Sequence, residues 1–222
     1  AVYRHELLRE LWSISGRFRA PESVAYDAAR RCLYVTNFNA DFVSKVGLDG
    51  TVIAEKWVTG LKGQTGTKLV GGRLFVVDRS GIVEIDPDTG SIVGRQAVPG
   101  AKFVNDLALD ETGAIYVTDS FGSSVYRLSG GTCEVWIEGE GLANPNGILV
   151  EKDRVLVGVT SDGTLKAVDR KTKEVSTFLT LGGHVNMDGL TGDGKGGYLF
   201  SDYYGRIYRA DAAGRRTLLL DS

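Results

Sequence analysis

A polar residue recurs at one phase of a repeat of about 41 residues, and each time a short apolar segment follows it. Each repeat then continues with three further strand-like segments, the second strand being rich in β-branched and aromatic residues. Turns built on Asp and Gly usually end the third segment. Five repeats are visible, and their recurring polar residues are Glu22, Thr65, Asn105, Asn146 and Asp188.

This pattern predicts an all-β chain, a β-propeller of four-stranded blades. Thirty glycines supply tight turns, and only four prolines leave the strand ladders able to donate hydrogen bonds. We expect one domain over residues 1–222, with an extra closing strand in residues 1–16 and blades at about 17–60, 61–100, 101–141, 142–182 and 183–222. The first strands are expected directly after the polar residues, at 23–27, 66–70, 106–110, 147–151 and 189–193.

Charge and hydropathy exclude several classes of partner. The formal net charge is −2, and basic and acidic residues are interspersed, so we expect neither nucleic acid nor an anionic membrane as a partner. No apolar run approaches the ~20 residues that a membrane helix needs. The chain does not begin with Met, which favours an exported (periplasmic or secreted) protein over a cytosolic one.

Cysteine and histidine are too few and too scattered for a structural zinc site. Cys32 falls in a second strand and Cys133 opens a fourth strand two repeats later, so we expect free thiols rather than a disulfide. His5 and His184 are the only two histidines.

A propeller would bring the first strands of its blades around one axis, and with them the recurring polar residues. Two carboxylates, Glu22 and Asp188, would then face the amides of Asn105 and Asn146. Carboxylates about 5 Å apart repel by roughly 3 kcal/mol, which a bound cation would relieve. The four side chains offer hard oxygen donors, which suit Ca²⁺, Mg²⁺ or Mn²⁺.

The alternative is that these residues cap turns. Asn and Asp ahead of a strand often accept hydrogen bonds from their own backbone, and Asn144–Gly147 is a turn sequence on any account. Caps could equally be Ser, Thr or Gly, and only Thr65 departs from the set of acids and amides. The repeated phase therefore favours a metal or ligand site.

Four motifs resemble those of the gluconolactonase and regucalcin family of propellers. They are Pro21-Glu22-Ser23-Val24, Asn105-Asp106-Leu107-Ala108-Leu109-Asp110, Pro145-Asn146-Gly147 and Asn186-Met187-Asp188-Gly189. The resemblance runs from about Phe18 to Ser222. It implies a hydrolase of sugar lactones or related cyclic esters, which uses a small-molecule substrate and one divalent ion.

The resemblance also implies roles for single residues. Glu22, Asn146 and Asp188 match the metal ligands, with Ca²⁺ as first choice and Mg²⁺, Mn²⁺ or Zn²⁺ as alternatives. Asn105 matches a residue that contacts substrate or metal-bound water, and Asp188 is the candidate general base, so both are expected to be catalytic. Phe103 and His184 are added as candidate substrate contacts because they lie near these motifs.

Two departures from the family keep a second function open. Family members usually have six blades, whereas this chain has five repeats and an N-terminal segment, His5–Ile14, that reads like a lone fourth strand. Phe103 and Lys102 also stand where sugar lactonases tend to have an arginine. The alternative is therefore a non-catalytic propeller that binds a small ligand or a protein through its channel face.

Overall fold

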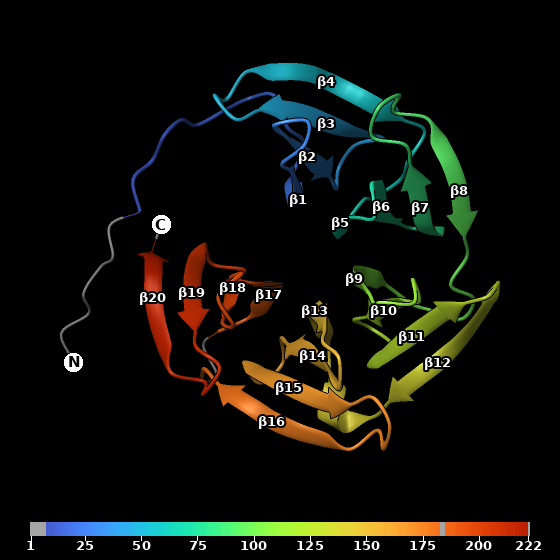
Figure 1. The fold of residues 1–222 in the computed structure, drawn as a ribbon, viewed down its shortest axis with the longest axis vertical. Helices are drawn as coiled ribbons and strands as arrows, with labels where there is room; N and C mark the ends of the chain where they lie inside the picture. The colour runs from blue at the N-terminus through green and yellow to red at the C-terminus, as the bar shows by residue number, and fades with distance from the viewer. Residues whose placement is uncertain (1–7, 183–184, 222) are drawn as a thin grey trace. The chain divides into compact units, whose positions relative to one another are not determined.

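The computed structural model describes residues 8–182 and 185–221, and almost all of their regular structure is β-strand. The described residues form five sheets of four strands each, in which consecutive strands are neighbours (Figure 1). The predicted all-β class and the predicted number of four-stranded blades are thus confirmed.

The first two blades use eight strands, β1 to β8. Their bounds are β1 Pro21–Asp27, β2 Cys32–Asn37, β3 Phe42–Gly47, β4 Val52–Thr59, β5 Thr67–Val70, β6 Arg73–Asp78, β7 Gly81–Ile85 and β8 Ile92–Gln96.

The other three blades use the remaining twelve strands. The third consists of β9 Val104–Leu109, β10 Ile115–Asp119, β11 Ser124–Ser129 and β12 Thr132–Glu138, followed by the short helix η1 Glu140–Leu142. The fourth consists of β13 Pro145–Val150, β14 Arg154–Val159, β15 Thr164–Asp169 and β16 Val175–Thr180. The fifth consists of β17 Met187–Gly192, β18 Tyr198–Asp202, β19 Arg206–Ala210 and β20 Arg216–Asp221.

The chain divides into two compact units within β9. One unit contains residues 10–107, and its core lies between the first two sheets, around Tyr34, Leu61, Leu74 and Ile85. The other contains residues 8–9, 108–182 and 185–221 among those described. Its core has two parts, one around Ile148 and Val157 and one around Phe200.

The buried ends of the second strands carry aspartates that cap the following turn. Asp78 accepts a hydrogen bond from the Ser80 backbone N–H, and Asp202 accepts from the N–H groups of Tyr204 and Arg206. Both carboxylates are buried. Such caps satisfy turn N–H groups that would otherwise lack a partner.

The described part of the N-terminal segment differs from the sequence prediction, whereas the two cysteines agree with it. Residues 8–16 form no strand, and Trp12 anchors this segment through a hydrogen bond of 2.7 Å from its indole N–H to the Leu48 carbonyl. The closing role of residues 1–16 stays a prediction. Cys32 is buried, Cys133 is partly buried, and both thiols are free. No helix within the described ranges has the length and apolar character needed to cross a membrane.

Candidate functional site

The three predicted metal ligands share one structural position, a β-bulge near the start of the first strand of a blade. In β1, Pro21 pairs with Asn37 and Val24 pairs with Val35, so Glu22 and Ser23 together oppose a single residue of β2. A bulge of this kind re-aims a side chain and is common beside active sites.

The same irregularity recurs in β13 and β17. Pro145 pairs with Val159 and Ile148 with Val157, which places Asn146 in the bulge of β13. In β17 the shift falls between Met187 and Leu190, and Asp188 occupies the bulge. For these three residues the expectation that they precede their strands is wrong, because the strands begin two residues earlier and include the bulge. Thr65 does precede β5, as expected.

Hydroxyl groups on the second strand fix two of the bulges. The Ser23 N–H donates to the Thr36 hydroxyl at 2.9 Å, and the Gly189 N–H donates to the Ser201 hydroxyl at 3.0 Å. A backbone N–H that the bulge removes from the ladder thus finds a side-chain acceptor. These hydroxyls escaped the sequence analysis, although they occur at one phase of the second strand.

Within residues 108–221, Asn146 and Asp188 lie side by side. The Asn146 amide nitrogen donates to the Asp188 carboxylate at 3.0 Å, and both side chains are half-buried. The backbones of β13 and β17 approach closely here, since a Cβ at Gly147 would lie 2.8 Å from the Leu190 nitrogen. Glycine after Asn146 is therefore required by this close approach.

Two further hydroxyls hold the carbonyl groups directly ahead of these side chains. Ser120 donates to the Pro145 carbonyl at 2.7 Å, and Thr160 donates to the Met187 carbonyl at 2.8 Å. Each hydroxyl belongs to the loop after a second strand and each carbonyl to the first strand of the next blade. They position the backbone that carries Asn146 and Asp188.

Within residues 10–107, the equivalent strands are joined in a similar way. The Gly66 N–H donates to the Asn105 carbonyl at 2.8 Å, and the Thr65 hydroxyl donates to the Val104 carbonyl at 3.3 Å. Thr65 and Asn105 are both buried, whereas Glu22 is exposed at the start of β1. Asp106, the residue after Asn105, pairs with Lys68 of β5 at 3.4 Å, which gives it a role in packing between blades.

Phe103 lines a cavity of about 360 Å³ together with Val98, Arg79 and Lys102. Its ring also lies 6.3 Å from that of Phe38, centroid to centroid. This cavity combines an apolar wall with two cationic side chains, which suits an acidic or ester-containing small molecule.

Three further aromatic side chains near the strand ends are solvent-exposed. Phe121, Tyr203 and Tyr204 follow the second strands of their blades and are 67%, 78% and 59% exposed. Tyr204 accepts a hydrogen bond from the Asn186 amide at 3.2 Å. His184 lies outside the described residues.

The donor set fits a hard cation in chemistry. No three His, Cys, Asp or Glu side chains in the described part of the chain gather as a metal site, but the predicted set contains an amide and is of another kind. The Asn146 nitrogen now faces Asp188, so a half-turn of its amide would present the oxygen instead. Asn146 and Asp188 therefore fit as neighbouring oxygen ligands.

Comparison with known proteins finds no matching family model and no matching curated sequence. Solved structures do match. A gluconolactonase from Xanthomonas campestris is 22% identical, with a TM-score of 0.74 over 92% of this chain and 77% of that one. The calcium-binding protein regucalcin from Agrobacterium tumefaciens is 18% identical, with a TM-score of 0.67 over 90% and 74%.

A virginiamycin B lyase from Staphylococcus aureus matches to a similar degree, at 15% identity and a TM-score of 0.67 over 92% of this chain and 70% of that one. Proteins named for different reactions thus share the fold, so fold alone does not select a reaction. At these identities, what the chain has in common with gluconolactonase and regucalcin is their β-propeller fold.

Proposed function

We propose that this protein is a metal-dependent hydrolase of a lactone, a sugar lactone or a related cyclic ester. The observation that carries the proposal is the shared bulge position of Glu22, Asn146 and Asp188 in three separate blades. Turn caps have no need of an extra residue inside a paired strand, whereas a re-aimed ligand does. The similarity to gluconolactonase structures supports the same reaction class.

Asn146 and Asp188 would hold the cation, with Glu22 as the third ligand and Ca²⁺ as the first choice. A divalent ion bound there would polarise the lactone carbonyl and acidify a water molecule. Asp188 would accept the proton of the attacking water, because its carboxylate is half-buried and already positioned by the Asn146 amide.

Substrate contacts are assigned to the unit that contains residues 10–107, and to one residue outside the described chain. Asn105 would donate its amide N–H to the substrate, and Phe103 would pack against the apolar part of the ring. The cavity beside Phe103 supports this assignment, since Arg79 and Lys102 add positive charge for the carboxylate that lactone opening releases. His184 is the remaining proposed contact.

The alternative is a non-catalytic propeller that binds a small ligand or a protein partner through its channel face. Phe103, in place of a sugar-binding arginine, is the observation that favours it. A measurement of lactone hydrolysis distinguishes the enzyme from the binding protein, because only the enzyme opens the ring.

The test is hydrolysis of aldonolactones and of simple γ- and δ-lactones with Ca²⁺, Mg²⁺, Mn²⁺ or a chelator, against a blank without protein. Metal-dependent turnover that falls by about 100-fold or more in Asp188→Asn supports the hydrolase. Glu174→Gln is the matched control, since Glu174 is exposed on a neighbouring blade. Absence of turnover with every metal would favour the binding propeller.

A further inference from the structure

The turn between β15 and β16, residues 169–173, has a close counterpart between β7 and β8, residues 86–90. In both turns the first aspartate accepts two backbone hydrogen bonds: Asp169 from Lys171 and Thr172, and Asp86 from Asp88 and Thr89. In both, the N–H of the fifth residue donates a hydrogen bond to the carbonyl of that aspartate, at 3.0 Å in the turn 169–173 and at 2.8 Å in the turn 86–90. The two turns are therefore built alike, and their differences lie in their side chains.

The fifth residue of the turn is Lys173 in one case and Gly90 in the other. Their φ angles are +65° and +74°, in the left-handed region that favours glycine. The turns ahead of β4 and β20 are one residue tighter, and they too have a glycine in the left-handed region, Gly50 and Gly214. Lys173 thus occupies a strained backbone position that related turns give to glycine, and such strain often accompanies a function.

The Lys173 ammonium lies over an aromatic ring, with Nζ 3.7 Å from the centroid of Trp136. Gly90 occupies the same place relative to Trp57, since a Cβ there would lie 3.2 Å from that ring. Among the described residues Lys173 belongs to none of the ion pairs, and the Glu134 carboxylate attracts its ammonium only electrostatically. Partial burial lowers the pKa of Lys173, so its ammonium would gain from an anionic partner.

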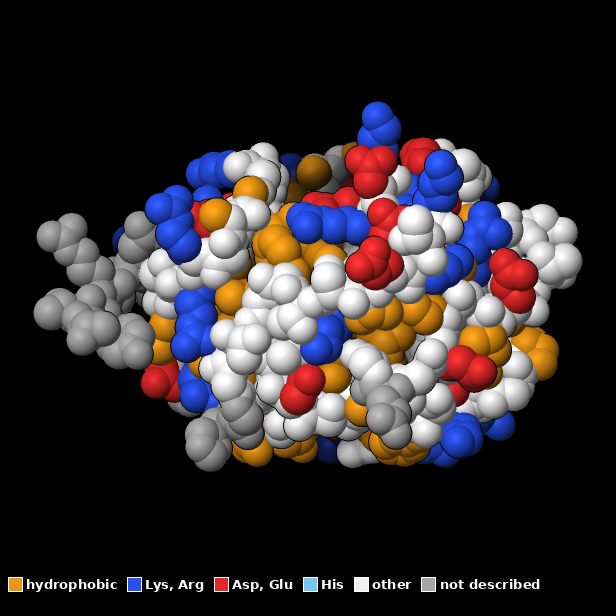
Figure 2. Space-filling view, turned by 90° about the horizontal axis from the view of Figure 1, so that it is seen from below, with side chains coloured by type: hydrophobic (Ala, Val, Ile, Leu, Met, Phe, Trp, Pro, Cys, Tyr) orange, Lys and Arg blue, Asp and Glu red, His pale blue; other side chains and the backbone are white. Residues whose placement is uncertain are grey.

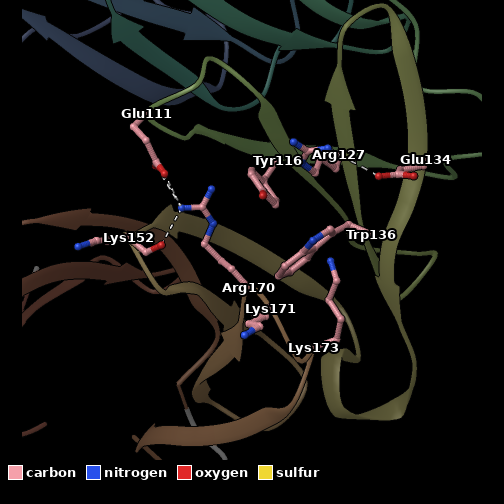
Figure 3. A pocket seen from close by; sticks show the side chains of 9 residues that line it. All are labelled: Glu111, Tyr116, Arg127, Glu134, Trp136, Lys152, Arg170, Lys171 and Lys173. Atoms are coloured by element: carbon pink, nitrogen blue, oxygen red, sulfur yellow. Dashed lines mark hydrogen bonds and ion pairs between the residues drawn. The ribbon is translucent and has the colours of Figure 1, made fainter.

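Lys173 and Trp136 border an open cavity of about 410 Å³ (Figure 3). The ring of Tyr116 meets that of Trp136 edge-on at 5.1 Å, and both side chains are buried. The guanidinium groups of Arg127 and Arg170 each lie 5.9 Å from the Tyr116 ring. The cavity thus has an aromatic floor with cationic groups around it.

Positive charge in this cavity exceeds what its acids can neutralise. Its lining includes five basic side chains and two glutamates. Arg170 is already paired, at 2.6 Å with Asp110 and at 3.1 Å with Glu111. Glu134 is 64% exposed and reaches Arg127 only at 3.8 Å. The glutamates therefore offset only part of the positive charge, and the net positive charge that remains can attract an anionic ligand.

The counterpart turn has the opposite character. Asp88 stands where the cationic turn has Lys171, and it pairs with Arg30 at 2.7 Å. Pro87 stands where the cationic turn has Arg170. A turn of the same backbone therefore tolerates an acid where the cationic turn has Lys171 and a glycine where it has Lys173, so the turn itself does not require these two lysines.

We infer that this cavity binds a small anion with two or more negative charges, a phosphate or a polycarboxylate, between Lys173, Arg127 and Lys171. The inference is independent of the proposed hydrolase. If Lys173 only covered the indole of Trp136, its replacement would leave anion binding unchanged.

Tripolyphosphate and tricarballylate, each titrated by calorimetry at constant ionic strength, separate the two anion types. We expect the wild type to bind one of them and Lys173→Gly to weaken that binding at least tenfold. Glycine is chosen because the counterpart turn folds with it, and circular dichroism checks the fold. Lys171→Gln, which keeps the turn backbone, should weaken binding as well.

Lys195→Gln is the control for loss of charge, because Lys195 is an exposed lysine in the turn between β17 and β18. It should bind the anion as the wild type does. The inference is overturned if neither anion binds the wild type, or if Lys195→Gln and Lys173→Gly weaken binding equally.

Discussion

The Asn146 amide donates a 3.0 Å hydrogen bond to the Asp188 carboxylate, and this bond joins the same bulge position of two neighbouring blades. This hydrogen bond gives both side chains a partner in the absence of metal. The pair therefore keeps its position before a cation binds. The bond would be exchanged for metal ligation when the amide turns its oxygen inward.

Calcium should raise the free energy of unfolding. A ligand at about 100 times its Kd adds about 2.7 kcal/mol when it binds only the folded chain. We expect the thermal midpoint to rise with Ca²⁺ and to fall back with chelator, and Glu22→Gln and Asn146→Ala each to remove most of the rise. A shift that persists in both variants would place the calcium elsewhere.

Gly147→Ala should destabilise the blade pair. The added Cβ would lie 2.8 Å from the Leu190 nitrogen, and such overpacking costs about 1–3 kcal/mol. Urea unfolding measures the difference. Gly192→Ala in β17 is the control, since its nearest neighbour would be 4.0 Å away, and equal losses in the two variants would contradict the explanation.

Thr160→Val should disturb the backbone ahead of Asp188. It removes the 2.8 Å hydrogen bond to the Met187 carbonyl at nearly constant volume, a loss of about 1 kcal/mol. We expect lower stability and a higher metal concentration for half-maximal lactone turnover. Thr217→Val is the control, because Thr217 is exposed on β20, and it should change neither quantity. If Thr160→Val left the half-maximal metal concentration unchanged, the Thr160 hydroxyl would have no positioning role.

Acid should weaken the fifth blade through Asp193. Hydrogen bonds from the Lys195 and Gly197 N–H groups, together with Arg209, lower the pKa of Asp193 from 3.8 to about 2. A depressed folded-state pKa contributes stability above 3.8, and this contribution is lost as the pH falls toward 2.

The variant Asp193→Asn removes that dependence. Its urea midpoint should lie below that of the wild type at neutral pH, and the gap should narrow as the pH falls from about 4 to 2. A gap of constant size across this range would show that the carboxylate titrates alike in folded and unfolded chains.

The repeat predicted the fold well because its strongest signal is local. Second strands such as Ile115–Asp119 are runs of β-branched and aromatic residues, and such runs indicate a strand without knowledge of the strands that pair with it. The interspersed charges were also predicted, and Figure 2 shows basic and acidic side chains mixed on the face that it draws.

The first strands were less predictable, since register depends on a partner strand. Nothing in Pro145-Asn146-Gly147 shows that two of its residues oppose the single residue Gly158. The hydroxyls of Ser120 and Thr160 were missed for the same reason, because their acceptors belong to the next blade. Lys173 was missed because a lysine in a polar turn looks ordinary until its φ angle is known.

The extra residue in β1, β13 and β17 also matters for how such a site can be gained or lost. Deleting one codon, that of Gly189 for example, would restore even pairing with β18 and turn Asp188 to the opposite side of its strand. The blade could survive that change while the proposed metal ligand Asp188 left the site. In a gene of this kind, a single in-frame deletion could therefore separate propellers that bind metal from propellers that do not.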